Sequence, residues 1–172
     1  MRKGYVQVYT GNGKGKTTAA LGLALRAAGA GMRVFLGQFI KEVKASEHKA
    51  LRRFADLITV AQFGRGMCIT REPAREDIEA AREGMRMASE ALASGRYDMV
   101  ILDEINVAVS LGLIDVEDVL RLIRERPSTI ELVLTGRGAD ERIITEADLV
   151  TEMRDIKHYW DKGVKARRGI EK

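Results

Sequence analysis

The sequence contains few cysteine, proline and aromatic residues. Among its 172 residues there are one cysteine and two prolines, and aromatic residues make up 5%. The single cysteine, Cys68, excludes an internal disulfide framework, so we expect a cytoplasmic protein. No apolar run approaches the roughly 20 residues of a transmembrane helix, and no signal-peptide pattern precedes the first apolar segment. We therefore expect no association with a membrane.

The charge of the chain is also modest. Lysine and arginine number 29 and aspartate and glutamate 25, which gives a net charge of +4. This balance suits an anionic ligand such as a nucleotide, but it is too weak to indicate nucleic acid. No module of interleaved aromatic and basic residues, as RNA-binding proteins carry, is visible. The length and the 45% apolar content predict one domain, 1–172, with a sizeable core.

Apolar strand patterns alternate with helical patterns along the whole chain. This alternation predicts an α/β fold with a mainly parallel sheet flanked by helices. No repeat, linker or low-complexity tract interrupts it, and a basic tail, 158–172, has no clear period. Strands are expected at 5–9, 32–39, 57–63, 99–102, 130–134 and 149–153. Helices are expected at 17–28, 47–55, 74–94, 116–124 and 139–147.

A glycine-rich loop, T-G-N-G-K-G-K-T-T at 10–18, follows the first strand and opens the first helix. Strand, loop and helix in this order predict a phosphate-binding P-loop. Its glycines let backbone N–H groups converge on phosphate oxygens, and the helix adds its positive end. Lys16 supplies a point charge, Lys14 a further cation, and the Thr17 hydroxyl a ligand for Mg²⁺. The predicted nucleotide-binding residues of the loop are Gly11, Asn12, Gly13, Lys14, Gly15, Lys16, Thr17 and Thr18.

Two further strand ends carry candidate site residues. V-I-L-D-E at 100–104 has the Walker B pattern, in which Asp103 faces Mg²⁺ directly or through water. Glu104 is a general base, a metal contact or a positioning group, and Thr17, Asp103 and Glu104 are the predicted metal ligands. T-G-R-G at 135–138 places Arg137 where ligands bind in open α/β sheets. The alternatives are two solvated acids and a plain turn with an exposed arginine.

The loop is one residue shorter than the usual G-x-x-x-x-G-K-[ST]. Thr10 stands where the first glycine should be, and the glycine follows at Gly11. A shorter loop should hold a triphosphate in a different register or direction. From the residues alone, the prediction reaches ATP and Mg²⁺ and stops at a P-loop small-molecule kinase or ATPase.

Five segments in order resemble a known family. G-N-G-K-G-K-T-T, G-Q-F-I-K, V-I-L-D-E, L-T-G-R-G and the ending E-M-R-D-I-K-H-Y-W-D-K-G-V-K-A-R-R-G-I-E resemble the bacterial P-loop type of ATP:corrinoid adenosyltransferase. The resemblance implies a RecA-like fold, a homodimer, ATP lying reversed in the loop, and Mg²⁺ or Mn²⁺ on its triphosphate. It implies transfer of the 5′-deoxyadenosyl group of ATP to the Co(I) of a reduced corrinoid, in cobalamin biosynthesis or salvage. Tripolyphosphate is released, and a flavoprotein often supplies the reduction.

The resemblance also assigns roles. Lys14 and Lys16 would stabilise the leaving triphosphate, and Glu104 would hold the metal or the nucleotide, because no water has to be activated. Gln38 and Lys41 would lie near the nucleotide and the corrinoid, unless they are merely polar residues at a strand end.

This chain departs from the family at two places. Met67 and Ile69 stand where family members carry an aromatic pair against the lower corrin face, and any N-terminal lid should be absent or very short. A further alternative is a regulator that binds ATP and a corrinoid without turnover. His48 and His158 are too isolated for a metal site and are expected to be surface or hydrogen-bonded residues.

Overall fold

A six-stranded parallel sheet forms the centre of the molecule, and its spatial order is β3-β2-β4-β5-β1-β6. The computed structural model describes residues 3–40, 46–64, 66 and 72–171. The predicted α/β class and parallel sheet are confirmed. The strands are β1 Val6–Thr10, β2 Val34–Phe39, β3 Ile58–Phe63, β4 Met99–Asp103, β5 Glu131–Thr135 and β6 Leu149–Glu152.

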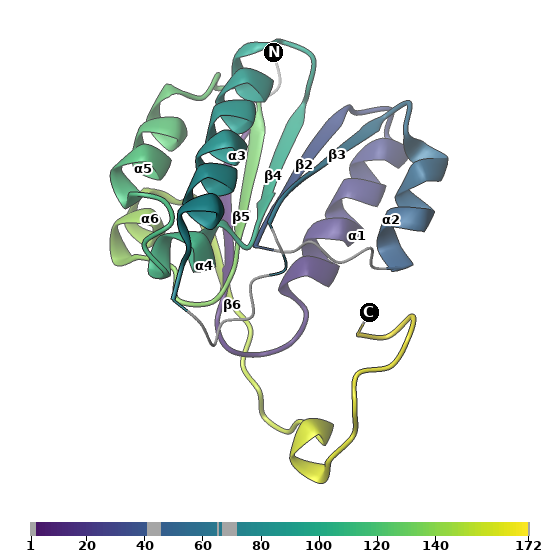
Figure 1. Cartoon of the computed structure of the whole chain (residues 1–172). Coiled ribbons are helices and arrows are strands. Elements are labelled where there is room, and N and C mark those ends of the chain that lie inside the picture. Colours follow the sequence, from purple (N-terminus) through teal and green to yellow (C-terminus); the bar gives the residue numbers. More distant parts are fainter. Residues whose placement is uncertain (1–2, 41–45, 65, 67–71, 172) are drawn as a thin grey trace.

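Helices cover both faces of this sheet (Figure 1). Two of them, α1 and α2, lie on one face, and α3 to α6 lie on the other. The helices are α1 Lys16–Gly29, α2 Ser46–Leu51, α3 Arg75–Ala93, α4 Ile105–Ser110, α5 Val116–Glu125 and α6 Glu141–Glu146. Two 3₁₀ turns add to them, η1 Arg52–Phe54 and η2 Tyr159–Lys162. This two-sided cover explains why the central strands are buried and apolar throughout.

The two faces of the sheet are packed differently. On the α1 face the helix contributes small side chains, among them Ala20 and Ala24, so the helix lies close to the strands. On the other face Phe39 and Phe63 pack against α3, with ring centroids 5.5 Å apart. Gly84 of α3 makes room for them, because an added Cβ would lie 2.6 Å from the Phe39 ring.

Helix α4 is an element that the sequence patterns did not predict. It starts directly after β4, because Glu104 takes a left-handed conformation (φ 63°) and turns the chain sharply. Its six residues are too few to display a helical period, and four of them, Ile105 to Ala108, are buried without an exposed polar face between them to mark one. Helix α6 is shorter than predicted, because the Asp140 side chain accepts a hydrogen bond from Arg142 N and begins the helix there.

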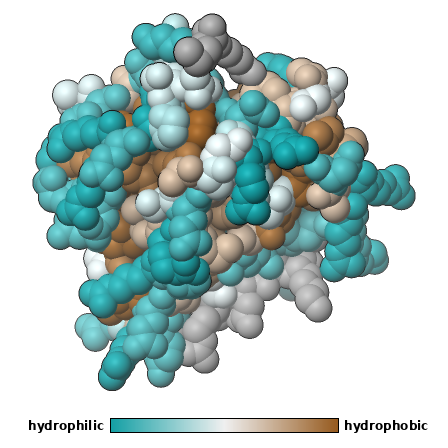
Figure 2. Space-filling view, turned by 90° about the horizontal axis from the view of Figure 1, so that it is seen from above, coloured by the Kyte–Doolittle hydropathy of each residue, from teal (hydrophilic) through white to brown (hydrophobic). Residues whose placement is uncertain are grey.

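All strands are parallel, so their carboxyl ends meet at one edge of the sheet, below the strands in Figure 1. The P-loop follows β1 at this edge, and the C-terminal segment after β6 runs beneath it. Figure 2 shows the opposite end of the molecule, where hydrophilic side chains cover much of the rim. Within the described residues, no helix is long and apolar enough to cross a bilayer.

Candidate nucleotide and metal site

The loop between β1 and α1 has the backbone geometry of a phosphate cradle. Gly11 and Gly15 have φ angles of +90° and +123°, which side chains rarely tolerate. Gly15 is the N-cap of α1, and no side chain caps the helix there. The first turn contains no acidic residue. The positive end of a 14-residue helix is thus directed at the space in front of the loop, where an anion is stabilised.

Gly13 has a packing role that sequence reasoning missed. Its N–H donates to the carbonyl of Met153, at 2.7 Å, where the chain leaves β6. A Cβ at Gly13 would lie 2.7 Å from the carbonyl carbon of Arg154. The loop and the C-terminal segment therefore touch backbone to backbone, and this contact requires glycine at position 13.

The two loop lysines lie in different environments. The Lys16 ammonium is buried and donates to the carbonyls of Gly11 and Gly13, both at 2.7 Å. Lys14 is exposed and donates to the carbonyl of Ile170 at 3.2 Å, with a Glu171 oxygen 4.0 Å away. Both predicted cations therefore lie at the cradle, and Lys14 contacts the end of the chain.

The predicted metal ligands lie together at the end of β4. The Thr17 hydroxyl donates to Asp103 Oδ1 at 2.9 Å, and Thr135 of β5 donates to the same oxygen at 2.6 Å. Asp103 is fully buried. Strand β5 lies between β1 and β4, which explains how Thr135 comes to meet both the P-loop and the Walker B strand.

This set of oxygen donors fits Mg²⁺ or Mn²⁺ bound together with a nucleotide. Within the described residues, no three histidine, cysteine or acidic side chains are grouped to hold a metal by themselves. Mg²⁺ in nucleotide sites is held by one or two protein oxygens, and phosphates and water complete its shell. The hydroxyl of Thr17 and the carboxylate of Asp103 are donors of this kind.

Glu104 follows Asp103 in the chain and lines the cavity in front of the loop. Its backbone N–H donates to the Thr135 hydroxyl at 3.0 Å, and its carbonyl accepts from Ala108 in α4. The left-handed conformation (φ 63°) is uncommon for a residue with a side chain, and it is held here by these two bonds.

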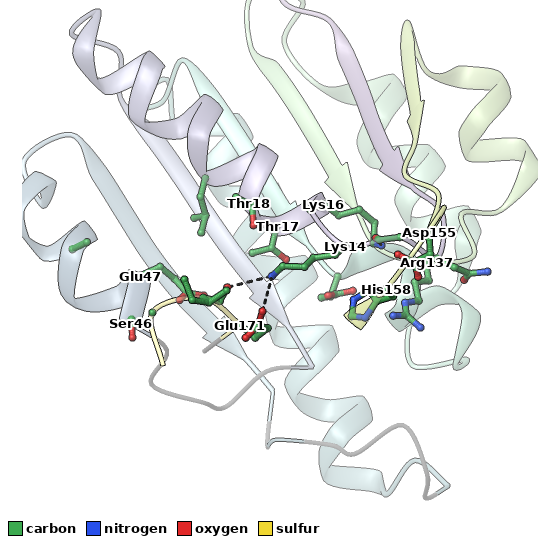
Figure 3. A pocket seen from close by; sticks show the side chains of 18 residues that line it. Lys14, Lys16, Thr17, Thr18, Ser46, Glu47, Arg137, Asp155, His158 and Glu171 are labelled. Atoms are coloured by element: carbon green, nitrogen blue, oxygen red, sulfur yellow. Dashed lines mark hydrogen bonds and ion pairs between the residues drawn. The ribbon is translucent and has the colours of Figure 1, made fainter. Parts of the chain in front are cut away.

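A cavity of about 730 Å³ opens in front of the loop, large enough for a nucleotide. Figure 3 shows Lys14 reaching toward Glu171, with Ser46 and Glu47 of α2 on one side and Arg137 and His158 on the other. The lining residues come from the P-loop, α1, α2, the ends of β4 and β5, and the C-terminal segment. They are Asn12, Gly13, Lys14, Gly15, Lys16, Thr17, Thr18, Leu21, Ser46, Glu47, Ala50, Glu104, Arg137, Asp155, His158, Gly169, Ile170 and Glu171.

The other predicted site residues have different outcomes. Gln38 does not line the cavity; it is fully buried, and its amide nitrogen lies 3.2 Å from Asp103 Oδ2. Arg137 is exposed and lines the cavity, and its contact with a nucleotide stays a prediction. Lys41, Met67 and Ile69 lie outside the described residues.

The C-terminal segment contributes a wall of the cavity that the residue patterns did not predict. Asp155, His158 and Glu171 line the cavity, although this tail has no period that predicts its path. In the sequence, only the resemblance of this tail to the ending of the family indicated that it has a functional role. Hydrogen bonds from Arg167, from the Tyr159 hydroxyl and from the Arg167 backbone lower the pKa of Glu171 to about 2. A carboxylate that stays charged therefore lies near Lys14.

The glycine-rich loop lies between strand β1 and helix α1, and a buried aspartate ends β4, which is separated from β1 in the sheet by β5 alone. This arrangement defines a P-loop nucleotide-binding protein with a RecA-like sheet. The sequence matches the family model of ATP:corrinoid adenosyltransferase BtuR/CobO/CobP over residues 2–171. The chain belongs to this family of transferases.

Named relatives agree with the family match. A corrinoid adenosyltransferase of Pseudomonas aeruginosa is 38% identical over 170 residues, which cover 98% of this chain and 84% of the relative. One from a Sinorhizobium species is 40% identical, with 98% and 80% covered. One from Escherichia coli K12 is 38% identical, with 98% and 86% covered.

Proposed function

We propose that this protein transfers the 5′-deoxyadenosyl group of ATP to the cobalt of a reduced corrinoid. The bond between C5′ and its oxygen breaks, and a bond between cobalt and C5′ forms. Co(I) supplies both electrons and becomes Co(III), while tripolyphosphate leaves with the electron pair of the broken bond. The observation that supports this reaction best is the P-loop, which is one residue shorter than usual and whose lysines border the cavity. It occurs in a chain that belongs to this family.

The chain's own groups act mainly on the leaving triphosphate. Lys16, Lys14 and the N-terminus of α1 form a preorganised positive site, which stabilises charge that develops on the leaving oxygens. Arg137, on the rim of the cavity, is placed to add a further contact. No proton has to be removed from a nucleophile, so Glu104 acts by holding the nucleotide or the metal shell rather than as a base.

A divalent metal would be held by Thr17 and Asp103, with Glu104 beside them. When bound, Mg²⁺ or Mn²⁺ neutralises part of the triphosphate charge. Burial of Asp103 and its hydrogen bonds with Thr17, Thr135 and Gln38 fix the carboxylate before the metal arrives. The positioning of C5′ against cobalt in a site that excludes water then accounts for the rest of the rate.

The resemblance also supports a homodimeric protein in the cytoplasm. It supports a flavoprotein as the reductant of the corrinoid and a role in cobalamin biosynthesis or salvage. These belong to the same proposal, as does the reversed direction of ATP in the short loop. A single crystal structure with bound ATP tests the direction: a triphosphate lying as in a full-length P-loop would contradict it.

The reaction is tested by identifying both products. The protein is mixed with ATP, Mg²⁺ and cob(I)alamin without oxygen, and the light-sensitive cobalt–carbon spectrum and the released phosphates are followed. We expect a photolabile corrinoid and tripolyphosphate in equal amounts. ADP and phosphate without alkylated cobalt would instead indicate the kinase or ATPase alternative, and binding of ATP and corrinoid without any product would indicate a regulator.

Lys16 provides the first mutational test. Lys16→Ala removes the ammonium that is fixed over the loop, and charge-assisted contacts contribute about 1.5–3 kcal/mol each. We expect kcat/KM for ATP to fall at least about 100-fold. Lys49→Ala, on the exposed surface of α2, is the matched control and should stay within about twofold of the wild type. An active Lys16→Ala variant would contradict the site assignment.

A further inference from the structure

A row of polar side chains crosses the sheet next to the P-loop. Gln38 on β2 is in register with Asp103 on β4 and with Gln62 on β3. Residues in register on neighbouring strands project from the same face, and two residues earlier that face carries Leu36 and Ile101 of the α1-side core. On this face, the polar row therefore lies directly beyond the apolar core and ends at Asp103, which with Thr17 forms the proposed metal site.

The hydrogen bonds of the row have a defined direction. Asp103, when ionised, only accepts, so the Gln38 amide must present its NH₂ group to Oδ2, at 3.2 Å. The Gln38 carbonyl oxygen then points away from Asp103 and needs a donor. His48 of α2 lies there, with its Nε2 2.5 Å from that oxygen. His48 Nε2 must therefore carry a hydrogen, an assignment that follows from the network.

Gln62 is a weaker partner of the same oxygen. Its amide nitrogen lies 3.5 Å from the Gln38 oxygen, at the limit of a hydrogen bond, and 3.3 Å from His48 Nε2. The second contact joins two donors and contributes no bond. His48 is thus the principal donor to a glutamine side chain that is fully buried and cannot turn to water.

We infer that His48 is a positioning residue that acts through Gln38 on Asp103. With Thr17 and Thr135 on Oδ1 and Gln38 on Oδ2, the orientation of the Asp103 carboxylate depends on the orientation of the Gln38 amide. Without His48, that amide loses its main restraint, and the carboxylate loses a fixed donor. Groups behind a metal ligand change metal affinity typically by about 10–100-fold.

The inference rests on the proposed function, because it takes Asp103 as the residue that holds the metal. It also connects two parts of the site. Helix α2 lines the nucleotide cavity through Ser46, Glu47 and Ala50, and His48 on the same helix reaches the metal end of the row. The wall of the cavity and the metal-ligand pair are therefore held in one hydrogen-bonded unit.

Two substitutions at one position separate positioning from packing. His48→Leu removes the donor, whereas His48→Gln retains an N–H at nearly the distance of Nε2. Affinity for ATP is measured by calorimetry with Mn²⁺ and with EDTA, in the absence of corrinoid, so that no turnover occurs. Lys49→Leu, one residue along the exposed side of α2, is the matched control.

We expect His48→Leu to weaken Mn²⁺-dependent ATP binding about 10-fold and to leave metal-free ATP binding within about twofold of the wild type. His48→Gln should restore most of the difference, and Lys49→Leu should behave as the wild type. Equal Mn²⁺ dependence in His48→Leu and the wild type would overturn the inference, as would a His48→Gln variant as weak as His48→Leu. If His48→Leu does not fold, His48→Asn, whose amide is too short to reach Gln38, takes its place.

The same experiment distinguishes failure of this inference from failure of the proposed function. Wild-type protein that binds ATP equally with Mn²⁺ and with EDTA would overturn the metal site and the role of His48 together. Normal metal dependence without transfer of the adenosyl group to cobalt would overturn the reaction and leave the role of His48 intact.

Discussion

At the scale of single residues, the glycines of the P-loop perform two different tasks. Gly11 and Gly15 take positive φ angles. Gly11 and Gly13 also have to be glycine because the backbone of Met153 and Arg154 passes within 2.4–2.8 Å of where their Cβ atoms would lie. A motif predicts the first task, since the pattern of the loop is local. The second depends on a segment about 140 residues away in sequence, so no local pattern can reveal it.

Gly13→Ala should destabilise the protein, because the new Cβ would meet backbone atoms 2.7–2.8 Å away that cannot move independently. We expect the free energy of unfolding to fall by about 1–3 kcal/mol, as for other overpacked sites. Gly22→Ala, in α1, meets nothing within 4 Å and should raise it by up to about 1 kcal/mol.

Urea unfolding of both variants measures the change in the free energy of unfolding. In a thermal scan, each kcal/mol of that change should shift Tm by about 2–4 °C in a protein of this size. The Gly13→Ala variant should also bind ATP less tightly, since the loop has to move away from Arg154. Equal stability of Gly13→Ala and the wild type would show that the C-terminal segment does not pack on the loop as described.

Within the part of the chain that the structure describes, two residues with side chains have left-handed backbone angles, and both follow a strand that leads into the site. Ile40 follows β2 and Glu104 follows β4, with φ angles of 69° and 63°. Such a conformation costs about 1–2 kcal/mol for a residue with a Cβ. For Glu104, the bond to Thr135 and the first turn of α4 offset this cost. Residue type gave no sign of either, because asparagine and glycine are the usual occupants.

At the scale of elements, the C-terminal segment is organised around one carboxylate. Glu171 accepts from the Arg167 backbone and guanidinium and from the Tyr159 hydroxyl, which closes the chain between η2 and the last residues into a loop. The same loop brings Ile170 and Glu171 to Lys14. The segment thus has a defined structure without a helical or strand pattern, which is why a tail was predicted instead.

The charge of Glu171 gives the segment a pH dependence with a definite sign. Its pKa is lowered from 4.5 to about 2, first by Arg167 and then by Tyr159. The folded pKa lies below the unfolded one, so the contribution of Glu171 to stability is complete above about pH 4.5 and is lost as the pH falls toward 2.

Trp160, the single tryptophan and 67% exposed, reports on this loop by its fluorescence anisotropy. We expect the anisotropy to hold from pH 7 to about 4.5 and to fall below that. Glu171→Gln should show the low value already at pH 7, while Glu90→Gln on the exposed side of α3 should not change it. A Glu171→Gln variant with the wild-type anisotropy would contradict the role of this carboxylate.

At the scale of the whole molecule, the site collects the ends of strands that are far apart in sequence. Asp103 and Thr135 are the last residues of β4 and β5, and Thr17 lies in the first turn of α1, after β1 and the P-loop. They meet because these three strands are parallel and adjacent. A ligand that binds only this assembled arrangement must stabilise the whole fold, because the unfolded chain does not contain the site.

ATP with Mg²⁺ at about 100 times its Kd should raise the free energy of unfolding by about 2.7 kcal/mol. For a chain of this length that corresponds to a Tm increase of about 5–10 °C. Tripolyphosphate with Mg²⁺ should also raise Tm, because the cations and the helix N-terminus act on the phosphates, whereas adenosine should have little effect. Thermal scans in the three ligands measure this. An increase with adenosine equal to that with ATP would contradict a triphosphate-centred site.

The sequence alone determined the strand order along the chain, the P-loop, the Walker B aspartate and the family. Each of these is a local signal: a strand pattern, a glycine spacing or a short motif that needs no distant partner. Long periodic elements such as α3 were predicted to within one residue at each end, and short ones such as α4 were not, because six residues show no period.

Only the tertiary structure decided which side chains meet across the strands. The family resemblance predicted Gln38 near the nucleotide and the corrinoid, and His48 was expected to be an isolated surface or hydrogen-bonded residue. The two form one row with Asp103 because β2 lies beside β4 and α2 lies on the same face. Glu171 reaches Lys14 because the chain after β6 turns back under the loop. Contacts between distant segments depend on how the whole sheet packs, and local sequence patterns do not specify that packing.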